Sequence, residues 1–280
     1  MHNIIIFGET GSGKSSLVNL VIGKAVAHVS NDASGCTFNN EFYETEIGDA
    51  KFRIYDTAGL NEGDQGRVPH WKAIHNLYTL IRELDGVSLL VYCLRGRIKE
   101  NSKANWILFN KVICAEQVPI IAAVTGLEME ADPDDWWRRA ENKESFKKHN
   151  MIPTDVACVV AVRFPEVQDT KYAHSQTKLR QLISESYRRL PWSKEKNSWF
   201  ASIYETVYDT GICLFAKKRL DFVQGMRKVF SELFSEAGMV EEDSKKLMTA
   251  LLDAEKKIMK QENRKVKKQM SKASFTFKVA

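Results

Sequence analysis

The stretch Gly8-Glu-Thr-Gly-Ser-Gly13-Lys14-Ser15 decides the fold, because it fits the pattern G-x-x-x-x-G-K-[ST] of a phosphate-binding loop. It follows the apolar run at residues 4–7, which predicts a strand, and it precedes apolar residues at helical spacing up to Gly23. Strand, glycine-rich loop and helix in this order are the context in which the pattern is informative. We therefore predict a nucleotide-binding loop at residues 8–16, called the phosphate loop below.

Each part of the predicted phosphate loop has a chemical task. Glycines let the backbone approach phosphate oxygens closely, while backbone amides and the helix N-terminus supply positive potential. Lys14 is expected to reach the β and γ phosphates, and Ser15 is expected to ligate Mg²⁺. A glycine-rich turn that binds nothing is the alternative. The predicted nucleotide contacts in the loop are Gly8, Glu9, Thr10, Gly11, Ser12, Gly13, Lys14, Ser15 and Ser16.

The chain continues with alternating strand and helix patterns. Extended runs at 41–47 and 51–55 predict an antiparallel hairpin, and apolar runs at 87–94, 118–124 and 155–162 predict buried strands. Helical patterns fall at 71–84, at 102–116, from Pro133 through Trp136 and Trp137, and from Leu179 to Leu190. This order predicts a three-layer α/β/α domain at residues 1–192 with a mostly parallel six-stranded sheet, and a helical extension at 193–280.

A second motif, Asp56-Thr57-Ala58-Gly59, stands at the predicted end of the third strand. There the Asp56 carboxylate is placed to reach Mg²⁺ directly or through water, and Gly59 to offer its amide to the γ phosphate. On its own this pattern is common at strand ends. Because this motif follows a phosphate loop and a hairpin in the sequence, it favours a nucleotide site.

Together these features resemble the G domain of the translation-factor-related GTPases, and within that class the septin-like branch with the immunity-associated and many fungal G-domain proteins. The resemblance covers most of residues 1–192. It implies bound GTP or GDP with Mg²⁺, and a threonine that senses the γ phosphate and the metal. Thr37 in Ser34-Gly-Cys-Thr37 is the candidate, with a solvated loop threonine as the alternative. The implied catalytic residues are Lys14, Thr37 and Gly59, and the implied metal ligands are Ser15, Thr37 and Asp56.

The chain departs from the general pattern after Gly59. Ras-like enzymes have a glutamine there, whereas this chain has Leu60, which cannot orient an attacking water by hydrogen bonding. We therefore expect slow GTP hydrolysis, or hydrolysis completed by a polar group at 61–65 or by a second subunit.

A second departure concerns the base. Where the resemblance implies N-K-x-D, the chain reads Thr125-Gly126-Leu127-Glu128. A Glu128 carboxylate would accept hydrogen bonds from N1–H and the 2-amino group of guanine, and adenine has neither donor. Gly126 stands in place of the lysine whose stem usually packs on the base. An exposed loop acid is the alternative for Glu128. We also expect a contact from Thr125. After the sixth strand, Arg163 is either a base-stacking or a surface arginine.

Composition limits the remaining choices. The 280 residues carry a net charge of +5, yet the segment from Lys256 to Lys272 holds eight Lys/Arg and one acid, so it contributes about +7 and the remainder about −2. We therefore expect no nucleic-acid binding by the domain. The basic segment is either a solvated helix face or a contact for an acidic partner or an anionic membrane surface. Nucleic acid is a less favoured partner of this segment, because it has no interleaved aromatic residues. Five scattered cysteines fit a reducing compartment, so we predict a cytoplasmic protein, with peripheral membrane contact through the basic segment as an option. Six histidines without ligand spacing predict no zinc site.

Three functions fit these observations. The first is a slow Mg²⁺-dependent GTPase that converts GTP to GDP and phosphate and acts as a molecular switch. The second is a scaffold that binds GTP without hydrolysing it and forms a homodimer or oligomer through the G domain. The third is an ATP-dependent kinase with Arg95-Gly96-Arg97 as its lid, a scheme in which Thr37 and Asp56-Thr57-Ala58-Gly59 have no role.

Overall fold

The computed structural model describes most of the first 192 residues. The described residues are 1–27, 42–57, 80–81, 84–98, 100–107, 109–110, 114, 116–163 and 169–192, with 242, 245–246, 249–250 and 253 beyond them. Nearly all of the predicted extension at 193–280 therefore lies outside the described residues, and its separation as a unit stays a prediction.

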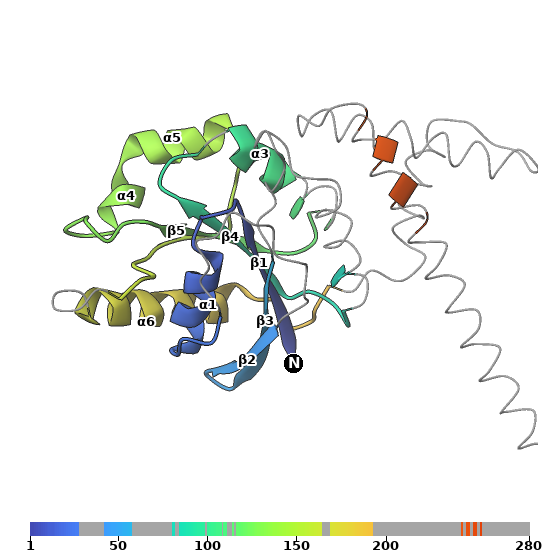
Figure 1. Ribbon diagram of the computed structural model, residues 1–280, viewed down its shortest axis with the longest axis horizontal. Helices are drawn as coiled ribbons and strands as arrows, with labels where there is room; N and C mark the ends of the chain where they lie inside the picture. Colours follow the sequence, from blue (N-terminus) through green and yellow to red (C-terminus); the bar gives the residue numbers. More distant parts are fainter. Residues whose placement is uncertain are drawn as a thin grey trace, which may run out of the picture.

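Six strands form one sheet in the order β2-β3-β1-β4-β5-β6. Among these described strands, β2 runs antiparallel to β3, in the hairpin that the sequence predicted, and the other strand pairs are parallel. This confirms the expected mostly parallel sheet (Figure 1). The strands are β1 (His2–Gly8), β2 (Phe42–Ile47), β3 (Ala50–Asp56), β4 (Leu89–Arg95), β5 (Ile120–Thr125) and β6 (Val156–Cys158).

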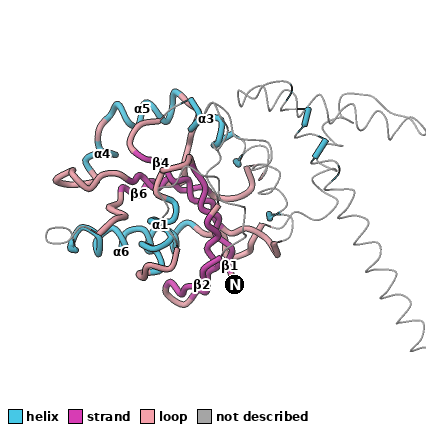
Figure 2. Tube along the Cα trace, viewed as in Figure 1, coloured by secondary structure: helices cyan, strands magenta, loops and turns pink. Residues whose placement is uncertain are grey.

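Helices cover both faces of the sheet, because successive side chains of a buried strand point to opposite sides. Ile4 and Ile6 of β1 belong to one buried cluster, with α1 (Lys14–Ile22) and α6 (Asp169–Ser186). Ile5 and Phe7 belong to the other cluster, which includes Trp106 and Phe146. Figures 1 and 2 show the two helical layers on opposite sides of the strands. Of the described residues, α3 (Glu100–Ile107), α4 (Asp135–Arg138) and α5 (Ala140–Lys148) belong to the second layer.

Several predicted boundaries were wrong. The sixth strand ends at Cys158 rather than at residue 162, because the Val160 amide donates to Ser175 Oγ of α6 at 2.9 Å and the chain leaves the sheet. The helix expected from Pro133 is two helices, since Arg139 is extended (ψ 126°). The α3 helix begins two residues before the predicted start at Ser102.

Other helix predictions have mixed outcomes. Leu190, the last residue of the helical pattern predicted from Leu179, lies beyond α6 and is 82% exposed. Most of the helix predicted at 71–84 lies outside the described residues. Among the helices that the structure describes, none has the length and apolar character needed to cross a membrane.

Candidate nucleotide-binding site

Three loops meet at one edge of the sheet, because β1, β4 and β5 are parallel neighbours whose carboxyl ends lie together. Gly8 is in register with Cys93, and Arg95 is in register with Thr125. In open α/β sheets this edge is where ligands bind. The edge therefore brings together the phosphate loop, the end of β4 and the segment 125–134, called the base loop below.

The phosphate loop is folded tightly onto β4. A Cβ built on Gly8 would lie 2.1 Å from the Cys93 carbonyl oxygen, and the Gly8 φ angle is +155°, so only glycine fits here. The Ser12 amide donates to the Glu9 carbonyl at 3.1 Å and closes a turn. Gly13 then forms the N-cap of α1 and accepts the Leu17 amide at 2.8 Å. The loop thus leads directly into a helix N-terminus, which attracts anions.

Lys14 lies within this loop with only 7% of its surface exposed. Its ammonium group donates to the carbonyl oxygens of Glu9, at 2.9 Å, and Gly8, at 3.3 Å. Both acceptors are backbone groups of the phosphate loop, so the charged Lys14 ammonium group lies within the loop. A phosphate bound there would meet an ammonium group that is already in place.

Ser15 and Asp56 come together across the sheet edge although they are far apart in sequence. The Ser15 hydroxyl donates to Asp56 Oδ2 at 2.7 Å. Thr57 fixes the end of β3 beside them, because its buried hydroxyl donates to the Ile6 carbonyl at 2.8 Å. A hydroxyl and a carboxylate are hard oxygen ligands, and Mg²⁺ usually takes one or two such protein ligands together with phosphate and water. The pair therefore fits the predicted magnesium site.

Two buried side chains support the phosphate loop from behind, at the Ser12 carbonyl oxygen. Thr125 Oγ1 donates to it at 2.6 Å, and Cys93 Sγ donates to it at 3.1 Å. Burial raises the pKa of the Cys93 thiol to about 11, so the thiol keeps its proton at neutral pH. The role of Cys93 was not predicted from the sequence, and the predicted contact residue Thr125 turns its hydroxyl toward the loop backbone.

The Glu9 side chain is directed to the neighbouring helix rather than along the loop. Its Oε1 accepts a hydrogen bond from Ser102 of α3 at 2.8 Å. The Glu9 side chain is thus engaged with α3, and the nucleotide contact predicted for Glu9 stays a prediction.

The base loop begins with a turn that positions Glu128. Leu127 is buried in the core, and its carbonyl accepts the Glu130 amide at 3.1 Å. Glu128 lies between these two residues and is half-buried. The predicted base-reading carboxylate is thus held in a short turn directly after β5.

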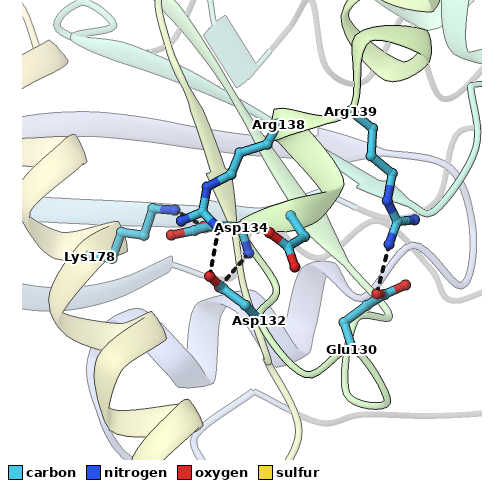
Figure 3. Close-up of polar contacts among 7 residues, drawn as sticks. Glu130, Asp132, Asp134, Arg138, Arg139 and Lys178 are labelled. Carbon is cyan, nitrogen blue, oxygen red and sulfur yellow. Dashed lines mark hydrogen bonds and ion pairs between the residues drawn. The ribbon is translucent and has the colours of Figure 1, made fainter.

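Ion pairs hold the rest of the base loop, as Figure 3 shows. Lys178 of α6 pairs with Asp134, and Arg139 pairs with Glu130 at 3.0 Å. The backbone N–H of Asp134, and then Arg138, lower the pKa of Asp132. Since the folded pKa is the lower one, the contribution of Asp132 is present above the unfolded pKa of about 3.9 and is lost as the pH falls through the folded value.

Other predicted site residues have different outcomes. Thr37, Gly59, Leu60 and the segment 61–65 lie outside the described residues. The guanidinium of Arg163, considered as a base-stacking group, lies over the Tyr172 ring at 4.5 Å from its centroid. In the described part of the chain, no group of three or more His, Cys, Asp or Glu residues could hold a metal ion.

Parts of the chain are similar to known proteins. Residues 3–125 match the family model described as 50S ribosome-binding GTPase, so the match includes the phosphate loop, Asp56 and the end of β5 but not Glu128. Over 101 residues the chain is 35% identical to GTPase Der of Rhodopseudomonas palustris (strain TIE-1), which covers 36% of this chain and 21% of that protein. Over 105 residues it is 32% identical to immune-associated nucleotide-binding protein 10 of Arabidopsis thaliana, covering 37% and 23%.

Among solved structures, Toc33 from Arabidopsis thaliana in complex with GDP and Mg²⁺ aligns with a TM-score of 0.49 at 15% identity. The alignment covers 68% of this chain and 86% of Toc33. The chain spans less than a quarter of the length of the two curated relatives.

Proposed function

We propose that this protein binds GTP with Mg²⁺ in the phosphate loop and hydrolyses it slowly, as a molecular switch. The observation that carries the proposal is the meeting of Lys14, Ser15 and Asp56 at one sheet edge. The match of residues 3–125 to a GTPase family model supports it. The partial identity with the Arabidopsis immune-associated protein supports a place in the septin-like, immunity-associated branch, and the fungal G-domain type stays a prediction.

The phosphate end of the site would act mainly by electrostatics. Lys14 and the loop amides would hold the β and γ phosphates, and Ser15, Asp56 and Thr37 would hold Mg²⁺. When bound, the metal neutralises charge on the phosphate oxygens. A water would attack the γ phosphorus while its bond to the β–γ bridging oxygen breaks, giving GDP and phosphate. Because Leu60 has no hydrogen-bonding group to orient that water, we expect slow turnover.

The base end would select guanine through Glu128. Its carboxylate accepts two hydrogen bonds from the guanine edge, whereas adenine offers an acceptor at N1 and no 2-amino group. Glu128 is half-buried in a turn that starts from the core residue Leu127, which limits its movement. We further propose that residues 193–280 form a helical extension whose basic segment, 256–272, contacts an acidic partner or an anionic membrane surface in the cytoplasm.

Nucleotide binding tests the central claim. GTP, GDP and ATP compete against a fluorescent guanine nucleotide in the presence of Mg²⁺, with wild type, Lys14→Ala and the matched control Lys24→Ala. Lys24 is exposed, so both variants lose one positive charge but only one loses it at the loop. We expect Lys14→Ala to lose about 100-fold or more in GTP affinity, since charge-assisted hydrogen bonds contribute roughly 1.5–3 kcal/mol each. Normal GTP binding by Lys14→Ala would overturn the proposal, and equal competition by ATP would overturn the guanine assignment.

Leu60 also favours a second function, a GTP-binding scaffold that builds a homo-oligomer. Phosphate release measured over a range of protein concentrations separates the two functions. A turnover rate per molecule that rises with concentration indicates an enzyme completed by a second copy, whereas no release at any concentration indicates the scaffold. Leu60→Gln is the informative variant, because a gain in unaided turnover would identify the missing glutamine as the cause.

A further inference from the structure

Arg95 lies directly against the first residues of the base loop. It ends β4 and is in register with Thr125 of β5, so its side chain stands beside Gly126. A Cβ built on Gly126 would lie 2.8 Å from Arg95 Cγ and 3.0 Å from Arg95 Nε. Gly126 also has a φ angle of +78°, which disfavours other residues. Because Gly126 has no side chain, the aliphatic part of the Arg95 side chain can occupy the space beside it.

The same arginine also borders the phosphate loop. It lines a cavity of about 110 Å³ together with Glu9, Thr10, Gly11 and Ser12. Within the part of the chain that the structure describes, no hydrogen bond or ion pair of the Arg95 side chain is found, and the residue is exposed. Arg95 thus spans from the phosphate loop to the base loop with its guanidinium group accessible.

We propose that Arg95 covers one face of the guanine base while Glu128 reads its edge, an inference that rests on the proposed function. Glu128 follows Gly126 by two residues, and the Arg95 side chain lies beside Gly126. A purine whose edge meets Glu128 would therefore extend along the loop surface that Arg95 covers. A guanidinium is planar and stacks well on aromatic faces. The other arginine considered for this role, Arg163, is already stacked on Tyr172.

Arg95→Ala, Arg95→Lys and the matched control Arg163→Ala test this assignment in the 280-residue chain. Affinities for GTP and GDP are measured by competition with a fluorescent guanine nucleotide, at low and at high salt. We expect Arg95→Ala to lose affinity roughly 3- to 30-fold, because a stacked guanidinium contributes in that range. The loss should be equal for GTP and GDP, persist at high salt and not be restored by lysine, since it comes from the planar group rather than the charge. Arg163→Ala should bind as wild type does.

Two results would overturn the proposal. One is a loss in Arg95→Ala no greater than in Arg163→Ala. The other is a loss that is larger for GTP than for GDP, fades with salt and is restored by Arg95→Lys, which would assign Arg95 to the phosphates. Gly126→Ala gives an independent check, because its Cβ should displace Arg95 and reproduce the loss while the melting temperature reports on folding. Failure of the proposed function is distinguishable, since wild type itself would then bind no guanine nucleotide.

Discussion

The phosphate loop and the base loop lie side by side at one sheet edge, yet different forces hold them. Behind the phosphate loop, the Ser12 carbonyl accepts from two buried side chains, and Gly8 is pressed against β4. The base loop beyond Glu128 is held by ion pairs such as Arg139 with Glu130, whose side chains are 50% and 35% exposed. Buried hydrogen bonds and close packing contribute more to stability than exposed ion pairs do.

The buried support of one loop and the exposed support of the other match two different requirements of a nucleotide site. A loop that cradles phosphates must present several amides and an ammonium group in fixed positions, and buried contacts supply that fixed geometry. A loop that reads one edge of a base needs fewer fixed groups, so it tolerates exposed supports. Substitutions in the phosphate loop should therefore have larger effects than substitutions in the base loop.

The largest effect should come from Gly8→Ala. The new Cβ would lie 2.1 Å from the Cys93 carbonyl oxygen, which is a backbone atom within the central sheet and cannot move away cheaply. We expect the free energy of unfolding to fall by about 3 kcal/mol or more, with a melting temperature roughly 10 °C lower. Thermal and urea unfolding monitored by circular dichroism would measure it.

Gly48→Ala is the matched control for that substitution. Gly48 has a φ angle of +58°, but a Cβ added there would meet no heavy atom within 4 Å, so the substitution carries only the conformational cost, about 1 kcal/mol. Equal losses at Gly8 and Gly48 would show that the packing against β4 is not a special feature of the phosphate loop.

Ser15→Ala should have the next largest effect, and it should appear only with magnesium. Removing the hydroxyl beside Asp56 takes away one of the proposed metal ligands. We expect GTP affinity in Mg²⁺ to fall roughly 10- to 100-fold, while binding in a chelator stays near the wild-type value. Ser184→Ala, at an exposed position of α6, is the control. An equal loss with and without Mg²⁺ would contradict the metal-ligand role.

Local patterns in the sequence predicted much of this arrangement. The phosphate loop and the hairpin could be recognised because the residues of each signal are close together in the sequence. The contacts of Cys93 and Thr125 with the Ser12 carbonyl could not, since these residues are 81 and 113 positions away and meet only through the strand order β1-β4-β5. The contact of Arg95 with Gly126 was missed for the same reason.

Strand and helix ends were predicted less well than their existence. An apolar run from 155 to 162 cannot tell where the chain leaves the sheet, because residues 159–161 stay buried after the strand ends. What ends the strand is a distant partner, Ser175 of α6, which takes the Val160 amide.

Thr125→Val should have a moderate effect on stability and on GTP affinity, because Thr125 lies where the phosphate loop and the base loop meet. It keeps the shape of the side chain but removes the buried hydrogen bonds to Ser12 and Leu94, which are 2.6 and 3.3 Å long. We expect the free energy of unfolding to fall by about 1–2 kcal/mol and GTP affinity to fall with it. Thr177→Val, which removes an exposed 3.1 Å hydrogen bond within α6, should change both quantities very little. Similar losses in the two variants would remove the distinction between buried and exposed support.

The smallest effect should come from the ion pair between Asp134 and Lys178, which joins the base loop to α6. Each side chain is 29% exposed, so water screens the attraction and the ordering of the long Lys178 side chain offsets much of it. In a double-mutant cycle with Asp134→Asn and Lys178→Met, we expect a coupling free energy below about 1 kcal/mol in urea unfolding. The preference for GTP over ATP should change by less than roughly threefold, because Glu128 is held by the turn at Leu127 rather than by this pair. A coupling as large as the loss in Thr125→Val would mean that the base loop is held as firmly as the phosphate loop.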